Sequence, residues 1–383
     1  MDMDFGLSKE DNIPQSGADT QAFNIESFLK LSVAQGFSDI HLRLNSPPMV
    51  RKDGVMMKSK LPPLTHEDLQ EVVRKIVPKN IQEVIDKHYD LDFSIEIPNM
   101  ARFRVNLLHD LGHIGFVLRI IPLSVPNFES LYLPPVIKDL TQSRNGLVLV
   151  TGPTGCGKST TLAAILDYIN QNDQKHIITL EDPIEFMYTN KKCVFTQREL
   201  GIDTDSFPNG LKYALRQDPD VILIGEMRDR ETITSALKAA ETGHLVFSTL
   251  HTTDAVQTIN RIINAFEPHE REPIRLQIAA ALRGTVAQKL VKRANGRGRV
   301  PATEILVATP AVRDYIIKDQ IDNIYDLINS GEYSGMMSMN HSLYKLVTAN
   351  MITDATAIDV SDSPNEMSQI LKGAFHGTRG IIE

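Results

Sequence analysis

The chain has 383 residues, which is longer than one typical domain and favours a protein of two domains. Hydrophobic residues make up 42% and charged residues 23%, as in globular proteins with sizeable cores, and the net charge of −8 offers no general attraction to nucleic acid or anionic lipid. The two cysteines, Cys156 and Cys193, exclude a disulfide framework and a four-cysteine zinc site. Because the start is acidic and no apolar run approaches the roughly 18–20 residues that span a bilayer, we expect a cytoplasmic protein.

The first third of the chain predicts a small α+β domain. Residues 1–23 are polar and without periodicity, which indicates a disordered tail. A helix that ends near Gly36 and a second, amphipathic helix around Leu69 are predicted by their apolar spacing. Alternating or β-rich segments predict strands at 38–44, 90–97, 101–108 and 112–121. Together they give a domain over residues 24–122.

The rest of the chain has the pattern of a parallel α/β sheet. Residues 123–134 are rich in proline and are expected to be a linker. Wholly apolar runs then alternate with helical segments, at 146–152, 176–182, 220–226 and 244–250. Such strands are typical of a sheet covered by helices on both faces. We expect this domain over residues 135–372, mainly helical in its last part, with a tail at 373–383.

One segment between an apolar strand and a helix matches a phosphate-binding loop. GPTGCGKS fits G-x-x-x-x-G-K-[ST] without a mismatch. Glycines let backbone N–H groups turn around phosphate, Lys158 reaches the β- and γ-phosphates, and Ser159 is a ligand for Mg²⁺. A chance match in a glycine-rich turn is the alternative, but the strand and helix around the motif favour nucleotide binding. The predicted nucleotide-binding residues are Gly152, Pro153, Thr154, Gly155, Cys156, Gly157, Lys158, Ser159 and Thr160.

Three polar residues follow other apolar strands and are candidates for catalysis. Because the carboxyl ends of parallel strands meet at one crevice, Glu226, Glu181 and His251 are expected near the loop. Glu226 is the candidate that orients or activates water, Glu181 is a second candidate for the water or the metal, and His251 is a candidate γ-phosphate sensor. Either glutamate would assist Ser159 at Mg²⁺, directly or through water. The alternatives are a charged residue at a strand end and a structural histidine.

The motifs, in this order, resemble those of the secretion ATPases of type II secretion and type IV pili. GPTGCGKST resembles their Walker A segment, ITLEDPIE their Asp box, DPDVILIGEMRD their Walker B segment and STLHT their His box. SDIHL, PPMVRKDG, DLDFS and RFRVN resemble the PAS-like N-terminal domain of the retraction branch, the PilT and PilU proteins. The resemblance implies an α/β protein with a RecA-like P-loop ATPase core and a smaller PAS-like α+β domain.

The same resemblance implies a motor and its partners. It implies a hexameric ring that hydrolyses ATP with Mg²⁺ and drives pilus retraction at the cytoplasmic face of the inner membrane, attached only through its partners. Those partners are an inner-membrane platform protein and, in some systems, a paralogous retraction ATPase. Arg104 and Arg119 match positions from which arginines of the N-terminal domain reach nucleotide, where they offset charge on the phosphoryl group. Solvated strand arginines are the alternative.

Two features bear on the branch. The tetracysteine zinc element of the assembly-type members has no cysteines here, whereas AVRDYIIK corresponds to the retraction motif AIRNLIRE. Ile317 and Lys318 replace the arginine and glutamate of that motif, so a PilT-like motor and a PilU-like accessory subunit both stay open. A nucleic-acid translocase on a related core is a further alternative; the acidic balance and the lack of an aromatic-basic track argue against it, and no nucleic-acid partner is expected.

Overall fold

The computed structural model describes residues 23–52, 54–97, 100–122 and 125–373. The chain forms two compact units, residues 1–123 and residues 124–383. Of the tails expected at 1–23 and 373–383, only residues 23 and 373 are described. The first two residues of the expected linker, 123–134, also lie outside the described residues. The remainder of that segment contains the short 3-10 helix η2, Glu129–Leu131.

The first unit is an antiparallel sheet packed against helices. Its six strands lie in the order β3-β2-β1-β6-β5-β4. Buried residues alternate along β5, where Phe103, Val105 and Leu107 join a core with Ile25, Leu29 and other residues of the helices. One sheet face is therefore buried and the other carries polar side chains. The elements are α1 (Ile25–Ala34), β1 (Asp39–Leu42), β2 (Met49–Lys52), β3 (Val55–Lys58), α2 (His66–Ile76), α3 (Lys79–Gln82), η1 (Ile85–Lys87), β4 (Asp90–Ile97), β5 (Ala101–Asp110) and β6 (His113–Pro122).

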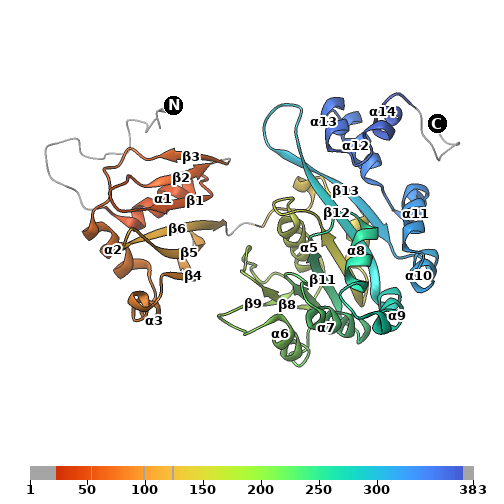
Figure 1. Cartoon of the computed structure of the whole chain (residues 1–383), viewed down its shortest axis with the longest axis horizontal. Coiled ribbons are helices and arrows are strands. Elements are labelled where there is room, and N and C mark those ends of the chain that lie inside the picture. The colour runs from red at the N-terminus through yellow and green to blue at the C-terminus, as the bar shows by residue number, and fades with distance from the viewer. Residues whose placement is uncertain (1–22, 53, 98–99, 123–124, 374–383) are drawn as a thin grey trace. The chain divides into compact units, whose positions relative to one another are not determined.

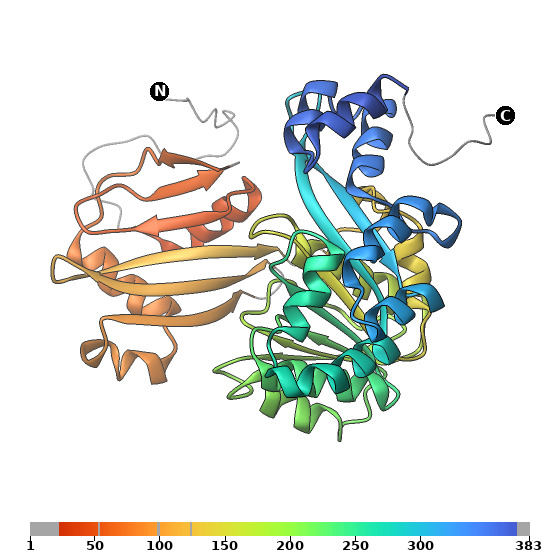
Figure 2. The ribbon, with the colours of Figure 1, turned by 45° about the vertical axis from the view of Figure 1, so that its right-hand side comes forward.

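The second unit is a seven-stranded sheet with helices on both faces (Figure 1, Figure 2). The strand order is β13-β12-β7-β11-β10-β8-β9, and all neighbours are parallel except β12 and β13. Its elements before the last two strands are α4 (Val136–Thr141), β7 (Gly146–Thr151), α5 (Lys158–Asn172), β8 (His176–Glu181), β9 (Val194–Glu199), α6 (Phe207–Ala214), β10 (Val221–Ile224), α7 (Arg230–Glu241), β11 (Leu245–Leu250), α8 (Ala255–Ile263), η3 (Pro268–Glu270) and α9 (Arg271–Ala281).

Alternate residues of β7 explain why this sheet needs cover on both faces. Leu147 and Leu149 belong to a core shared with α7, α8 and α9. Val148 and Val150 belong to a second core, shared with α4 and α5. All four side chains are fully buried, which accounts for the apolar run that marks this strand in the sequence.

The end of the chain contains two long strands that the sequence analysis does not predict. β12 (Leu282–Lys292) and β13 (Arg299–Val307) form an antiparallel pair at the edge of the sheet (Figure 1). β12 follows α9 without a turn and carries charged residues, so its sequence continues a helical pattern. The helices after them are α10 (Pro310–Ile317), η4 (Ile321–Asn323), α11 (Ile324–Ser330), η5 (Glu332–Ser334), α12 (Met339–Thr348), α13 (Asp354–Val360) and α14 (Pro364–Leu371).

Candidate nucleotide-binding and hydrolysis site

The phosphate-binding motif forms the turn between β7 and α5. Gly152, Gly155 and Gly157 have φ angles of 138°, 79° and 92°, a region that favours glycine. A Cβ atom at Gly152 would overlap the carbonyl oxygen of Gln288 and lie 2.6 Å from Cys156 Sγ. α5 begins at Lys158, so its positive N-terminal end faces the turn. The geometry fits a phosphate group.

The remaining residues of the motif line the turn and the start of α5. Pro153 and Thr154 are exposed in the loop, and Ser159 and Thr160 are half-buried in the first helical turn. Cys156 is buried, and burial raises the pKa of its thiol. The thiol therefore stays protonated and serves as a small packing group. All nine predicted residues lie together.

The Lys158 side chain is folded back over the loop. Its Nζ donates hydrogen bonds to the carbonyl oxygens of Gly152, at 2.8 Å, and Pro153, at 3.3 Å. The same atom lies 3.5 Å from Nδ1 of His251. An ammonium group that donates to two backbone carbonyl oxygens is available to an arriving phosphate, because hydrogen bonds to a charged acceptor are the stronger ones.

The order of the strands places His251 and Glu226 beside the loop. β11 lies next to β7, and β10 lies next to β11. His251 directly follows β11, and Glu226 lies two residues after β10. Ser248 and Thr249 of β11 donate hydrogen bonds to the carbonyl oxygens of Ile224 and Gly225 and so tie the two strand ends together.

Glu226 is held between two cationic or polar groups. Its Oε2 lies 2.8 Å from Nε of Arg228, and its Oε1 lies 3.3 Å from Nε2 of His251. The two ring nitrogens of His251 thus face Lys158 on one side and Glu226 on the other. Lys158, His251 and Glu226 therefore form a continuous polar line across three strand ends.

Glu181 lies at the end of β8, the next strand along, in a different environment. Burial raises its pKa to about 7, although Thr179 Oγ1 donates to its Oε1 at 2.6 Å. Its other hydrogen bonds come from Gln197 and the backbone of Glu185. These contacts turn the carboxyl group toward its own neighbours, and a partly protonated carboxyl is a weak metal ligand.

Two residues of the site are missed by the sequence analysis. Arg228 stands two positions after Glu226 in the quoted GEMRD segment, a signal that was present in the sequence. Gln288 of β12 donates from Nε2 to the carbonyl oxygen of Cys156, at 2.5 Å, and accepts from Thr161 Oγ1, at 2.9 Å. It braces the loop, and no motif marks it because its strand was not predicted.

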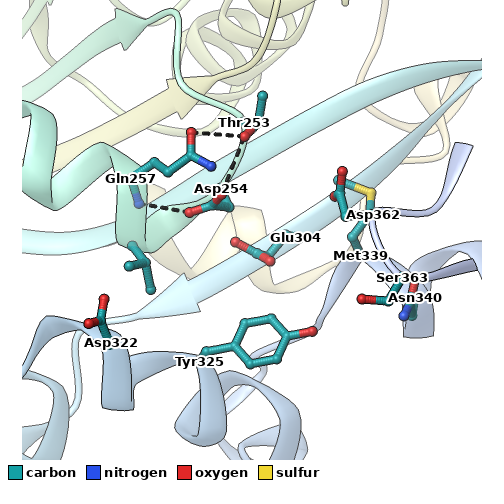
Figure 3. A pocket seen from close by; sticks show the side chains of 11 residues that line it. Thr253, Asp254, Gln257, Glu304, Asp322, Tyr325, Met339, Asn340, Asp362 and Ser363 are labelled. Carbon is teal, nitrogen blue, oxygen red and sulfur yellow. Dashed lines mark hydrogen bonds between the residues drawn. The ribbon is translucent and has the colours of Figure 1, made fainter. Parts of the chain in front are cut away.

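Three pockets border or neighbour the site. One of about 450 Å³ is lined by Glu226, Arg228, His251, Arg261 and their neighbours. One of about 140 Å³ lies beside the first turn of α5, where the Arg293 guanidinium lies 5.0 Å from the Tyr132 ring centroid. The third, about 410 Å³, contains Glu304 and several aspartates (Figure 3). In the described part of the chain, no three His, Cys, Asp or Glu side chains are arranged to hold a metal ion.

Arg104 and Arg119 belong to the first unit. They are direct partners in the register of β5 and β6. Arg119 Nε donates to Asp39 Oδ1 at 2.9 Å. Burial alone would raise the pKa of Asp39, but hydrogen bonds from Arg119 and Ser38 bring the pKa below its usual value. The two arginines thus form one cationic pair, and the loop with its strand-end residues lies in the other unit.

Comparisons with known proteins agree with these motifs. Residues 21–345 match the family described as type II/IV secretion system protein. The type IV pilus ATPase PilT of Pseudomonas aeruginosa is 44% identical over 89% of this chain and 99% of its own length. The type IV pilus ATPase PilU of the same organism is 38% identical over 91% of each chain.

A solved structure of a pilus retraction motor is also similar to this chain. The crystal structure of the pilus retraction motor PilT with bound ADP has a TM-score of 0.85 and 42% identity, over 91% of this chain and 99% of that one. In residues 23–52, 54–97, 100–122 and 125–373, every helix is too short or too polar to cross a lipid bilayer. The chain belongs to the type II/IV secretion system protein family, in its branch of pilus retraction ATPases.

Proposed function

We propose that the chain is an ATPase subunit that drives type IV pilus retraction. The observation that carries the proposal is the line of contacts from Lys158 through His251 to Glu226 beside the loop. ATP would draw Lys158 from the two carbonyl oxygens onto its β- and γ-phosphates, while the loop N–H groups hold the phosphate oxygens. Glu226 would then orient the attacking water, with His251 next to the γ-phosphate.

Mg²⁺ fits this arrangement as a partner of the nucleotide. The Ser159 hydroxyl in the first turn of α5 would hold it, and Glu226 would act on it through water. Magnesium commonly keeps several waters and binds substrate phosphates with few protein ligands, so the site needs no cluster of carboxylates. When bound, Mg²⁺ offsets charge on the transferring phosphoryl group. The base and sugar of the nucleotide would extend toward the pocket of Tyr132 and Arg293.

The subunit would work in a homo-hexamer, at the cytoplasmic face of the inner membrane, through a platform protein. The higher identity to PilT than to PilU supports a motor rather than an accessory subunit. The accessory role remains the second candidate because Ile317 and Lys318 depart from the retraction motif; Ile317 is exposed and Lys318 pairs with Asp314 at 2.7 Å. A chain without turnover of its own would favour the accessory role.

Substitution of Glu226 by glutamine tests the proposed chemistry. The amide cannot accept a proton and positions water poorly, so we expect ADP and ATP affinity to persist and turnover to fall about 100-fold or more. Glu241→Gln, an exposed change at the end of α7, is the matched control. Near-normal turnover in Glu226→Gln would remove Glu226 from catalysis, and retraction in cells that carry only this variant would argue against the motor.

A further inference from the structure

We infer that the pocket beside Glu226 is a binding site for inorganic phosphate, formed by Arg228 and Arg261, and that it receives the phosphate released by hydrolysis. The inference rests on the proposed ATPase function. The pocket measures about 450 Å³ and is lined by Glu226, Met227, Arg228, Leu250, His251, Thr252 and Arg261. A cavity volume of this kind needs only about 10–15 Å³ to hold one water molecule, so the pocket has room for a phosphate ion with part of its hydration.

The charges that line this pocket favour an anion. Two guanidinium groups and an imidazole face one carboxylate, Glu226. Arg228 is paired with that carboxylate through Nε at 2.8 Å. Arg261, on the last turn of α8, is exposed and takes part in no hydrogen bond or ion pair within the described parts of the chain. A free guanidinium beside a cavity is suited to a phosphate because its planar donors match two phosphate oxygens.

His251 connects this pocket to the loop. Its Nδ1 faces Lys158 at 3.5 Å, and its Nε2 faces Glu226, in the pocket wall, at 3.3 Å. A phosphate that leaves Lys158 therefore meets His251 first and the two arginines next. Lys158 at one end of this path and the two guanidinium groups at the other supply donors, so the phosphate has a cationic partner where it starts and where it arrives.

The Glu226 carboxylate and a bound phosphate would compete for the Arg228 guanidinium. That guanidinium holds Glu226 in the structure, and a phosphate in the pocket would compete for the same donors. While phosphate is bound, Glu226 would retain only His251 as a partner. Occupation of the pocket therefore links product release to the position of the residue that orients water, and it predicts inhibition by phosphate.

The test is the affinity for inorganic phosphate measured by calorimetry on the full chain without nucleotide. We expect Arg261→Ala to weaken phosphate binding about tenfold, in line with the loss of one charge-assisted contact, and Arg261→Lys to weaken it less. Arg297→Ala, which removes an exposed arginine between β12 and β13, should match the wild type. The same titrations in a Lys158→Ala background separate the pocket from phosphate held by the loop.

Two results would overturn the inference. The first is equal phosphate affinity in the wild type and Arg261→Ala; if ring assembly also changes in that variant, the pocket is assigned to a carboxylate of a second copy. The second is an equal loss in Arg297→Ala, which would reflect net charge alone. Absence of ATP turnover in the wild type would contradict the proposed function instead, and the phosphate titrations remain readable in that case.

Discussion

The acidic side chains of this protein differ in the groups that surround them. Glu226 contacts Arg228 and His251, whereas Glu304 on β13 is buried beside other acids. Figure 3 shows Glu304 between Asp254 and Tyr325 in the pocket it shares with Asp362. The Glu304 side chain accepts a hydrogen bond from the backbone N–H of Ala255, the first residue of α8, at 2.8 Å. It thereby fixes the helix that follows His251.

The buried position of Glu304 predicts a dependence of stability on pH. Burial raises its pKa from 4.5 to about 7. Between these values the folded chain binds more protons than the unfolded one, so the free energy of unfolding falls as pH rises through this range. Glu304→Gln keeps an acceptor for Ala255 but cannot ionise. We expect the Glu304→Gln variant to show a weaker dependence of the free energy of unfolding on pH. Above pH 7 it should be more stable than the wild type, by at most on the order of 3 kcal/mol.

Urea unfolding at pH 5 and pH 8 measures this effect. Glu181 titrates in the same range, so part of the slope should remain in Glu304→Gln. Glu241→Gln again serves as the exposed control. An unchanged difference between the two pH values would show that Glu304 does not carry the titration.

At the scale of elements, the loop after β7 depends on close contact with β12. Gly152→Ala places a methyl group against the Gln288 carbonyl at a φ of 138° and should cost more than the roughly 1–3 kcal/mol of backbone strain alone. Gly155→Ala, at a φ of 79°, meets no atom within 4 Å and should cost roughly 1–2 kcal/mol. Free energy of unfolding and ADP affinity measured on both variants check the ranking. Equal losses would mean that the contact with β12 is unimportant.

Some strands of the second unit could be predicted from the sequence and others could not. β7, β10 and β11 were predictable because each is apolar on both faces, and the loop because its glycines and lysine have fixed spacing. β12 and β13 were not, because charged residues and continuity with α9 mask the strand pattern. Gln288 was missed with its strand. The approach of His251 to Lys158, 93 residues apart, depends on strand order, which no local pattern specifies.

At the scale of the whole molecule, the paired arginines and the loop lie in different units of the chain. We expect Arg119 to act on nucleotide bound by another subunit of a ring. Neither Arg119→Ala nor Lys158→Ala alone should hydrolyse ATP well. In an equal mixture of the two variants, roughly a quarter of the interfaces would combine an intact loop with an intact arginine, and these interfaces should recover activity. ATPase assays of the mixture and the separate variants decide this. A mixture no more active than its components would contradict action between subunits.

Arg313 tests the link between hydrolysis and force. On α10, Val312 and Ile316 are fully buried, and Arg313 Nε is buried without a hydrogen-bond partner among the described residues. We expect Arg313→Ala to keep ATP turnover within about twofold, since a side chain outside the site adds little to the chemical step, and to reduce retraction in cells. Arg297→Ala, which removes an exposed arginine between β12 and β13, is the control. A parallel loss of turnover would indicate damage to the fold or the ring.

The strand order has a consequence for how the chain is made. β7 is the first strand of its sheet to leave the ribosome, yet its two neighbours are β11 and β12, which begin at residues 245 and 282. β8, β9 and β10 pair among themselves before either exists. The strand that carries the phosphate loop therefore has no partner while residues 152–244 are made, and the loop gains its contact with Gln288 only after β12 follows.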